Sequence, residues 1–170
     1  YWNADVDLLG FVDCDMRRLL NGYADADFDT QRCVPMLYNG RNPVKRRLTA
    51  GGQMILRQDV EEPNYGLVGR RYCDQLVDRC RELKPRVVIL SDYGKGVFDP
   101  EMIRSLIDLF SVMDDVVIVA DVKSGPLEAW LGVDVLRISR RAGEEPPRRD
   151  LACLGTVVTH HGHGYTEYYA

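Results

Sequence analysis

The stretch VVILSDYGKG at residues 87–96 decides the fold of this chain. Its four leading apolar residues are typical of a strand buried on both faces, as in parallel sheets. The run ends in a turn with an acid, a lysine and two glycines, and ligands of open α/β sheets bind just beyond such strand ends. The stretch therefore predicts a site for a small anionic or hydroxylated ligand, with an ordinary surface turn as the alternative.

The chain on either side alternates between strand and helix patterns. We expect strands at 5–12, 87–90, 116–120, 133–138, 156–159 and 165–169, and helices at 13–20, 67–83 and 100–113. Residues 22–43 are weakly patterned and are expected to be loop or irregular edge structure. This alternation predicts the α/β class with a doubly wound, mostly parallel sheet, in which the strands from 87 to 159 are neighbours.

A predicted β-hairpin interrupts the alternation. Residues 44–61 contain two β-prone arms around Gly51-Gly52, a dipeptide that supplies the positive φ values of a tight turn. We expect this small hairpin to form a sheet of its own over the strand ends.

Composition narrows the possible functions. A length of 170 residues fits one domain, and a net charge of −4 gives no reason to expect a nucleic-acid partner. No apolar run approaches the length of a membrane span, so we expect no membrane partner. The five cysteines are scattered, which favours a reduced intracellular protein over a disulfide scaffold.

Two segments partly match the sequence patterns of metal-binding sites. Residues 25–29 alternate acids as a calcium loop does, but Thr30 and Met36 replace the glycine and glutamate that such a loop needs. The histidines at 160–163 have no cysteine or acid at ligand spacing, and a glycine-containing turn explains them. We therefore assign no metal ligand.

Three segments taken together carry a resemblance. They are VKRRLTAGGQMILRQD at 44–59, SDYGKG at 91–96 and ADVKSG at 120–125. Their residues, order and spacing resemble the kinase domain of bifunctional heptose-phosphate kinase/adenylyltransferases, within the ribokinase family of carbohydrate kinases. The resemblance implies a ribokinase-like fold and phosphoryl transfer from ATP, with Mg²⁺, to a sugar hydroxyl. It also implies a sugar phosphate substrate and a cytoplasmic homo-oligomer, a homodimer with lid hairpins at the contact.

The resemblance also implies residues that bind the substrate. Those on or near the lid hairpin that covers the sugar are Lys45, Arg57 and Asp59. Asp92 and Lys95 would face the substrate and phosphate region. The alternative for Lys95, and likewise for Lys123, is an ordinary solvated turn lysine.

A second group is implied on the nucleotide side. Lys123 would lie close to the nucleotide phosphates. THHGHG at 159–164 resembles the turn usually written Thr-x-Gly-x-x-Gly, with the first glycine displaced by one place. That turn implicates Thr159, Gly162 and Gly164 in nucleotide binding.

The chain departs from the family pattern in three places. The family's glycine-rich sugar segment should precede residue 5, and its Gly-Ala-Gly-Asp segment, with the catalytic base, should follow residue 170. Its Asn-x-x-Glu falls on Ser139-Arg140-Arg141-Ala142. We therefore predict a partial ribokinase-like domain over 1–170, with a lid at 44–61, an α/β core at 67–170 and both ends of the family fold missing. No catalytic residue is assigned.

Two functions remain open from the sequence. One is a sugar kinase domain of the heptose-phosphate type, seen in part. The other is a catalytically inactive kinase homologue that serves as a binding or assembly protein. If the 170 residues are the whole protein, we expect no competent kinase.

Overall fold

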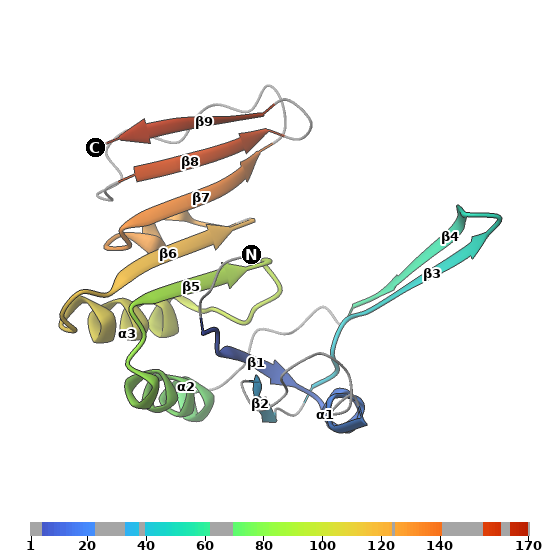
Figure 1. Ribbon diagram of the computed structural model, residues 1–170, viewed down its shortest axis with the longest axis horizontal. Helices are drawn as coiled ribbons and strands as arrows, with labels where there is room; N and C mark the ends of the chain where they lie inside the picture. The colour runs from blue at the N-terminus through green and yellow to red at the C-terminus, as the bar shows by residue number, and fades with distance from the viewer. Residues whose placement is uncertain are drawn as a thin grey trace. The chain divides into compact units, whose positions relative to one another are not determined.

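The computed structural model describes residues 5–22, 33–37, 40–61, 70–123, 125–140, 155–160 and 164–169. The chain divides into two compact units, Tyr1–Tyr65 and Gly66–Ala170. Their strands and helices are labelled in Figure 1. The single partial domain expected from the sequence remains a prediction.

The first unit contains a short parallel strand pair. Strand β1 (Leu8–Val12) is followed by helix α1 (Cys14–Gly22) and strand β2 (Cys33–Leu37), and β1 pairs with β2 in parallel. The expectation of loop or irregular structure across 22–43 was wrong for β2. Its pattern is weak because Pro35 interrupts the five residues, and a proline, which cannot donate to a ladder, is tolerated where a strand has only one partner.

A reciprocal polar contact holds the start of α1 against the segment before the hairpin. The Asp13 carboxylate accepts from the backbone N–H of Met16 at 2.7 Å and of Asn42 at 2.8 Å. In return the backbone N–H of Asp13 donates to Asn42 Oδ1 at 2.6 Å. These backbone hydrogen bonds favour the ionised carboxylate and lower the pKa of Asp13.

The hairpin forms as the sequence predicts. Strands β3 (Val44–Ala50) and β4 (Gln53–Val60) pair in antiparallel register, with an irregularity between Leu48 and Thr49. Gly51 and Gly52 have φ values of 56° and 79°, the positive pair that a two-residue turn requires.

The second unit is a five-stranded sheet in the order β5-β6-β7-β8-β9. The strands are β5 (Val87–Asp92), β6 (Val117–Val122), β7 (Val135–Arg140), β8 (Gly155–His160) and β9 (Gly164–Tyr169). Strands β5 to β8 are parallel neighbours, and β9 runs antiparallel to β8. The predicted α/β class and mostly parallel sheet are confirmed.

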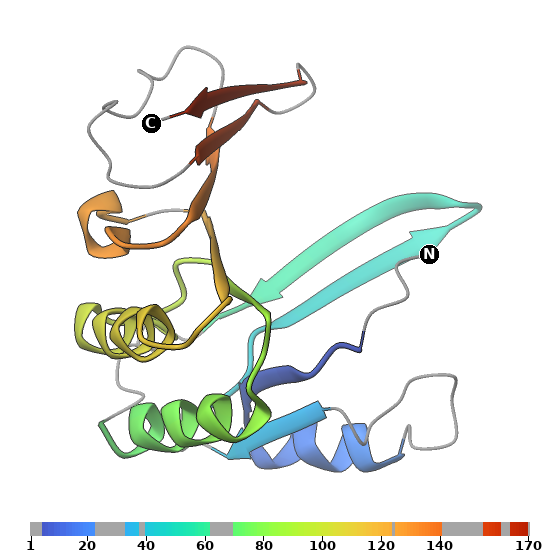
Figure 2. The same cartoon turned by 60° about the vertical axis from the view of Figure 1, so that its left-hand side comes forward.

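Three helical segments accompany this sheet: α2 (Arg70–Leu83), α3 (Pro100–Ser111) and the 3₁₀ turn η2 (Leu127–Trp130). Helix α3 begins at residue 100, as predicted. Asp99 is its N-cap and accepts from Met102 N–H at 2.8 Å, and Pro100 lies in its first turn. Figure 2 shows α3 and η2 on the same side of the sheet. Both connect parallel strands that advance in one direction, and right-handed crossovers place such connections on one face.

The side of the sheet under α3 is the covered face. Buried residues of α3 (Met102, Ile103, Leu106, Ile107 and Phe110) pack there with buried strand residues (Leu90, Ile118, Ala120, Val122, Leu136, Ile138 and Val158). Trp130 of η2 is buried and meets the Phe98 ring edge-on, with centroids 5.6 Å apart. The core of the second unit therefore lies on this face.

The opposite side is the open face, formed by the alternate residues of β5 to β8. Val87, Ile89 and Val117 point to it and are 55%, 66% and 43% exposed. The expectation that β5 is buried on both faces was therefore wrong. The crossover segments α3 and η2 both lie on the covered face (Figure 2). Neither of them therefore shields Val87, Ile89 or Val117.

No helix in the described parts of the chain is long and apolar enough to cross a membrane.

Candidate functional site

The hairpin brings three predicted site residues onto one face. Lys45 of β3 lies directly opposite Asp59 of β4, and Arg57 is two residues from Asp59 on the same strand. Alternate residues of a strand share a face, and directly opposed residues lie on the same side of an antiparallel pair. Lys45, Arg57 and Asp59 therefore share one charged face.

Ion pairs organise this face. Arg57 donates two hydrogen bonds to the Asp59 carboxylate, Nε to Oδ1 at 2.9 Å and Nη2 to Oδ2 at 2.6 Å. The contact lowers the pKa of Asp59 and raises that of Arg57, chiefly through the hydrogen bonds themselves. Lys45 Nζ lies 3.9 Å from Glu61 Oε1. A fixed, forked guanidinium of this kind suits a carboxylate or phosphate partner.

Arg47 belongs to the same face, although the sequence did not single it out. Its cross-strand partner is Arg57, so two arginines lie directly opposite each other across the hairpin. Like charges in this position destabilise a β-ladder, and an anion between them would relieve the repulsion. The register fixed by Gly51-Gly52 was the signal that could have identified Arg47.

Asp92 ends strand β5 on the covered face. Its carboxylate is buried and accepts from the backbone N–H of Gly94 at 2.8 Å, while its carbonyl oxygen accepts from Lys123 N–H at 2.9 Å. Burial raises the pKa of Asp92, and the hydrogen bond from Gly94 only partly offsets this. In this arrangement the side chain holds the turn that carries Lys95.

The two lysines lie at the same edge of the sheet. Lys123 follows β6 and is exposed, and Lys95 is half-buried in the turn after β5. Because the carboxyl ends of parallel strands share one edge, both ammonium groups belong to the edge where ligands of α/β sheets bind.

Thr159 lies one residue before the end of β8, on the open face. Its hydroxyl accepts from Arg137 Nη2 at 3.1 Å and donates to the carbonyl oxygen of Ile138 at 3.3 Å. Arg137 Nη1 also donates to Asp121 Oδ1 at 2.5 Å. Sequence reasoning missed both Asp121 and Arg137, because a lone Arg inside a strand pattern gives no signal of a cross-strand cluster.

The structure does not bring all the predicted residues together. Gly164 starts β9, and Gly162 lies outside the described residues. Asp92 and Thr159 occupy opposite faces of one sheet, as the strand register requires. The three hairpin residues belong to the other unit.

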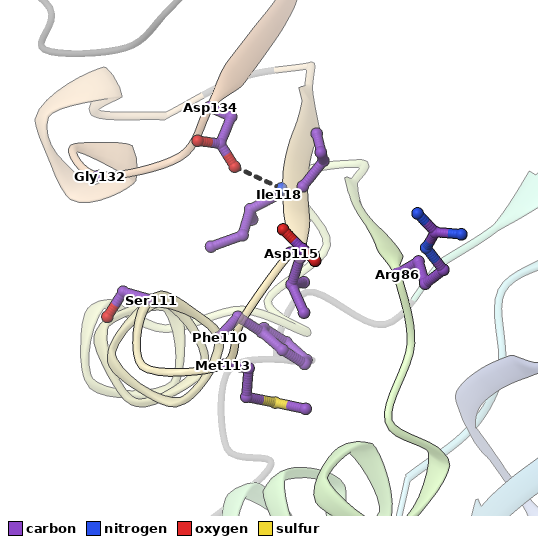
Figure 3. A pocket seen from close by; sticks show the side chains of 10 residues that line it. Arg86, Phe110, Ser111, Met113, Asp115, Ile118, Gly132 and Asp134 are labelled. Atoms are coloured by element: carbon purple, nitrogen blue, oxygen red, sulfur yellow. Dashed lines mark hydrogen bonds between the residues drawn. The ribbon is translucent and has the colours of Figure 1, made fainter.

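A cavity of about 520 Å³ lies at the amino-terminal ends of the strands (Figure 3). Arg86, Asp115, Asp134 and Phe110 are among its lining residues. The Asp134 carboxylate accepts from the backbone N–H of Ile118 at 2.7 Å and so closes the start of β6 against β7. This cavity is at the opposite end of the sheet from the predicted ligand edge, and its Asp134 carboxylate has a structural partner.

The described residues contain no group of three or more His, Cys, Asp or Glu side chains that could hold a metal ion. Among the described residues near the carboxyl ends of the strands, Asp121 is bound by Arg137 and Asp92 by Gly94. These two side chains do not by themselves fit a Mg²⁺ site.

Known proteins support the resemblance. The bifunctional protein HldE of Magnetococcus marinus is 34% identical over 108 residues, covering 59% of this chain and 21% of that protein. HldE of Campylobacter jejuni subsp. jejuni serotype O:2 is 27% identical over 143 residues, covering 84% of this chain and 29% of that protein. This chain is a relative of the HldE proteins. The predicted relationship is thereby confirmed, and the chain spans less than a third of the length of these relatives.

Two further comparisons add little. No family model matches the sequence. A crystal structure of phosphomethylpyrimidine kinase from Clostridium difficile 630 superposes on this chain with a TM-score of 0.42 and 10% identity. The superposition covers 96% of this chain and 85% of the chain in that crystal structure.

Proposed function

We propose that this chain carries part of an ATP-dependent sugar kinase domain, which transfers a phosphoryl group to a hydroxyl of a sugar phosphate. The relationship to HldE proteins supports a kinase of this kind. The observation that carries the proposal furthest is the charged face of the hairpin, where Lys45, Arg47 and Arg57 lie with only two carboxylates, Asp59 and Glu61.

This face suits a sugar phosphate chemically. The opposed residues Arg47 and Arg57 offer the donors that a phosphate monoester needs, and two hydrogen bonds to Asp59 orient Arg57. The Asp59 carboxylate, kept ionised by Arg57, is an acceptor for a sugar hydroxyl. In this proposal the hairpin binds the sugar phosphate.

The strand ends of the second unit suit the nucleotide. Lys95 and Lys123 supply positive charge at the ligand-binding edge of the sheet, where developing negative charge on a transferring phosphoryl group needs compensation. Asp92 maintains the turn that carries Lys95 through its hydrogen bond from Gly94.

One observation favours a second candidate. Ser139 of β7 occupies the place of the asparagine in the related kinases' Asn-x-x-Glu pattern. The second candidate is an inactive homologue that serves as a binding or assembly protein. A homologue of this kind would show no phosphoryl transfer, and one that has also lost its ligands would bind neither sugar phosphate nor ATP.

Calorimetric titration with a heptose phosphate, which gives the affinity of the chain for this ligand, tests the proposal. Arg47→Gln and Arg57→Gln should each weaken binding by about tenfold or more, because each removes a charge-assisted hydrogen bond. Arg46→Gln is the matched control, since Arg46 points to the other side of the same strand and donates to Gln58 at 3.3 Å. Equal losses in all three variants, or no binding by the wild-type chain, would contradict the proposal.

We also propose that the chain forms homo-oligomers through the hairpin. The side of the hairpin opposite the charged face carries Val44, Leu48, Leu56 and Val60, which are 42–58% exposed, with the Arg46–Gln58 pair between them. Isolated two-stranded hairpins are marginal in water, so this surface requires cover. Light scattering after size exclusion should give an oligomer for the wild type and a smaller species for Leu48→Ser/Leu56→Ser. A monomeric wild type would refute this proposal.

A further inference from the structure

A polar cluster crosses three adjacent strands on the open face. It consists of Asp121 on β6, Arg137 on β7 and Thr159 on β8. Asp121 is directly opposite Arg137 in the register, whereas Thr159 is two positions beyond Val157, the β8 residue paired with Arg137. The Arg137 side chain therefore extends from the middle of β7 toward the carboxyl ends of the strands.

The neighbours of Arg137 on the open face are mixed in character. Val135 and Ser139 flank it along β7, and Asp121 and Val157 lie opposite it on β6 and β8. The Arg137 and Asp121 side chains are 40% and 34% exposed, and ion pairs with this much solvent contact contribute little to folding stability. A contribution to folding stability therefore does not explain why an arginine stands at position 137.

The hydrogen bonds restrict what Thr159 can do. Its single hydroxyl proton is directed to the Ile138 carbonyl oxygen, and one of its lone pairs accepts from Arg137. In this arrangement Thr159 has no proton to donate to a phosphate oxygen. A neighbouring residue must therefore donate the hydrogen bond to the nucleotide phosphates that the resemblance implies for Thr159.

That neighbour is Arg137. A guanidinium has five N–H donors, and the contacts with Asp121 and Thr159 engage two of them. Those contacts also fix the plane of the guanidinium, so that little conformational freedom remains to be lost when an anion binds. Lys123, two residues after Asp121 and beyond the end of β6, adds a second positive charge at the same edge.

We propose that Arg137 is the phosphate-binding residue on the nucleotide side, held in place by Asp121 and Thr159. The inference rests on the proposed function, because it names the group that receives the phosphates of a nucleoside triphosphate. Asp121 and Thr159 are positioning residues in this account and do not touch the ligand.

The test measures the Kd of the 170-residue chain for ATP, tripolyphosphate and adenosine. Arg137→Gln should weaken ATP and tripolyphosphate binding by about tenfold or more and leave adenosine unchanged, because only the phosphate contact is lost. Thr159→Val should cost less than Arg137→Gln, since it removes one of the two contacts that hold the guanidinium. Arg137→Lys, which keeps the charge without the fork, should fall between wild type and Arg137→Gln.

Arg81→Gln is the matched control. Arg81 forms an exposed ion pair with Asp78 at 2.8 Å on α2, far in sequence from the cluster, and its loss should change none of the three affinities. Circular dichroism at the titration temperature establishes that each variant is folded.

The outcomes separate the inference from the proposed function. If the wild type binds ATP and tripolyphosphate but Arg137→Gln binds them equally well, the inference is overturned and the proposed function stands. A loss larger in Thr159→Val than in Arg137→Gln also overturns it, because Thr159 would then be the donor. If the wild type binds neither ligand, both are overturned.

Discussion

The two faces of the β5–β8 sheet come from the same four strands and differ in what covers them. On the covered face, Ile118, Ala120 and Val122 of β6 are at most 2% exposed beneath α3. On the open face, Val117 of the same strand is 43% exposed, and Asp121 binds Arg137. One sheet therefore supplies the core with its covered face and carries the polar cluster of Asp121, Arg137 and Thr159 on its open face.

The largest expected effect is in the core. Phe110→Ala should lower the free energy of unfolding by about 3–5 kcal/mol, because Phe110 is 1% exposed and its loss leaves a cavity under α3. Val112→Ala, at an 81% exposed position next to the helix end, should change it by less than about 0.5 kcal/mol. Urea denaturation of both variants measures the contrast, and similar losses would show that α3 does not cover the sheet as described.

A smaller effect compares the two faces directly on β6. Val122→Ala removes a side chain that is 0% exposed and should cost about 1.5–3 kcal/mol of unfolding free energy. Val117→Ala is the same chemical change on the open face and should cost less than about 1 kcal/mol. Equal costs would mean that the open face is buried in solution, and the difference between the faces would be lost.

The smallest expected effect depends on pH. Burial raises the pKa of Asp92 in the folded state, so its contribution to stability is full below the ordinary value of 3.8 and is lost as pH rises through the raised pKa. Asp92→Asn should therefore be at least as stable as the wild type near neutral pH and relatively less stable in acid.

Asp13→Asn is the paired control for that measurement. The pKa of Asp13 is lowered by backbone hydrogen bonds, so its contribution is present above 3.8 and lost as pH falls through the lowered pKa. The asparagine variant should therefore be less stable than the wild type at neutral pH, with a difference that shrinks in acid. Urea denaturation series from about pH 3 to about pH 7 would show the opposite trends, and parallel trends would contradict the placement of Asp92.

Much of the fold could be predicted from local patterns. The apolar runs of β5 to β8 are signals within a few residues, and the structure has these strands as expected. Asp99-Pro100, which starts α3, is a signal of the same local kind. Gly51-Gly52 likewise fixed the hairpin, because two adjacent positive φ values select a two-residue turn. By contrast, β2 was missed because Pro35 interrupts its five residues.

Exposure could not be predicted in the same way. An apolar run such as 87–90 indicates a strand, but whether its second face is covered depends on elements far along the chain, as Ile89 shows. The same limit applies to the candidate site. Lys45, Arg57 and Asp59 could be placed from the hairpin register, whereas the Arg137 cluster depends on the alignment of three strands separated by long connections.

The central claim is that the chain has two ligand sites, a hairpin site for a sugar phosphate and a strand-end site for ATP. Calorimetry with both ligands tests it most directly, with a heptose phosphate titrated into the chain saturated with a non-hydrolysable ATP analogue and Mg²⁺, and the reverse. The account predicts that each ligand binds once per chain in the presence of the other. Mutual exclusion of the two ligands, or binding of neither, would contradict it.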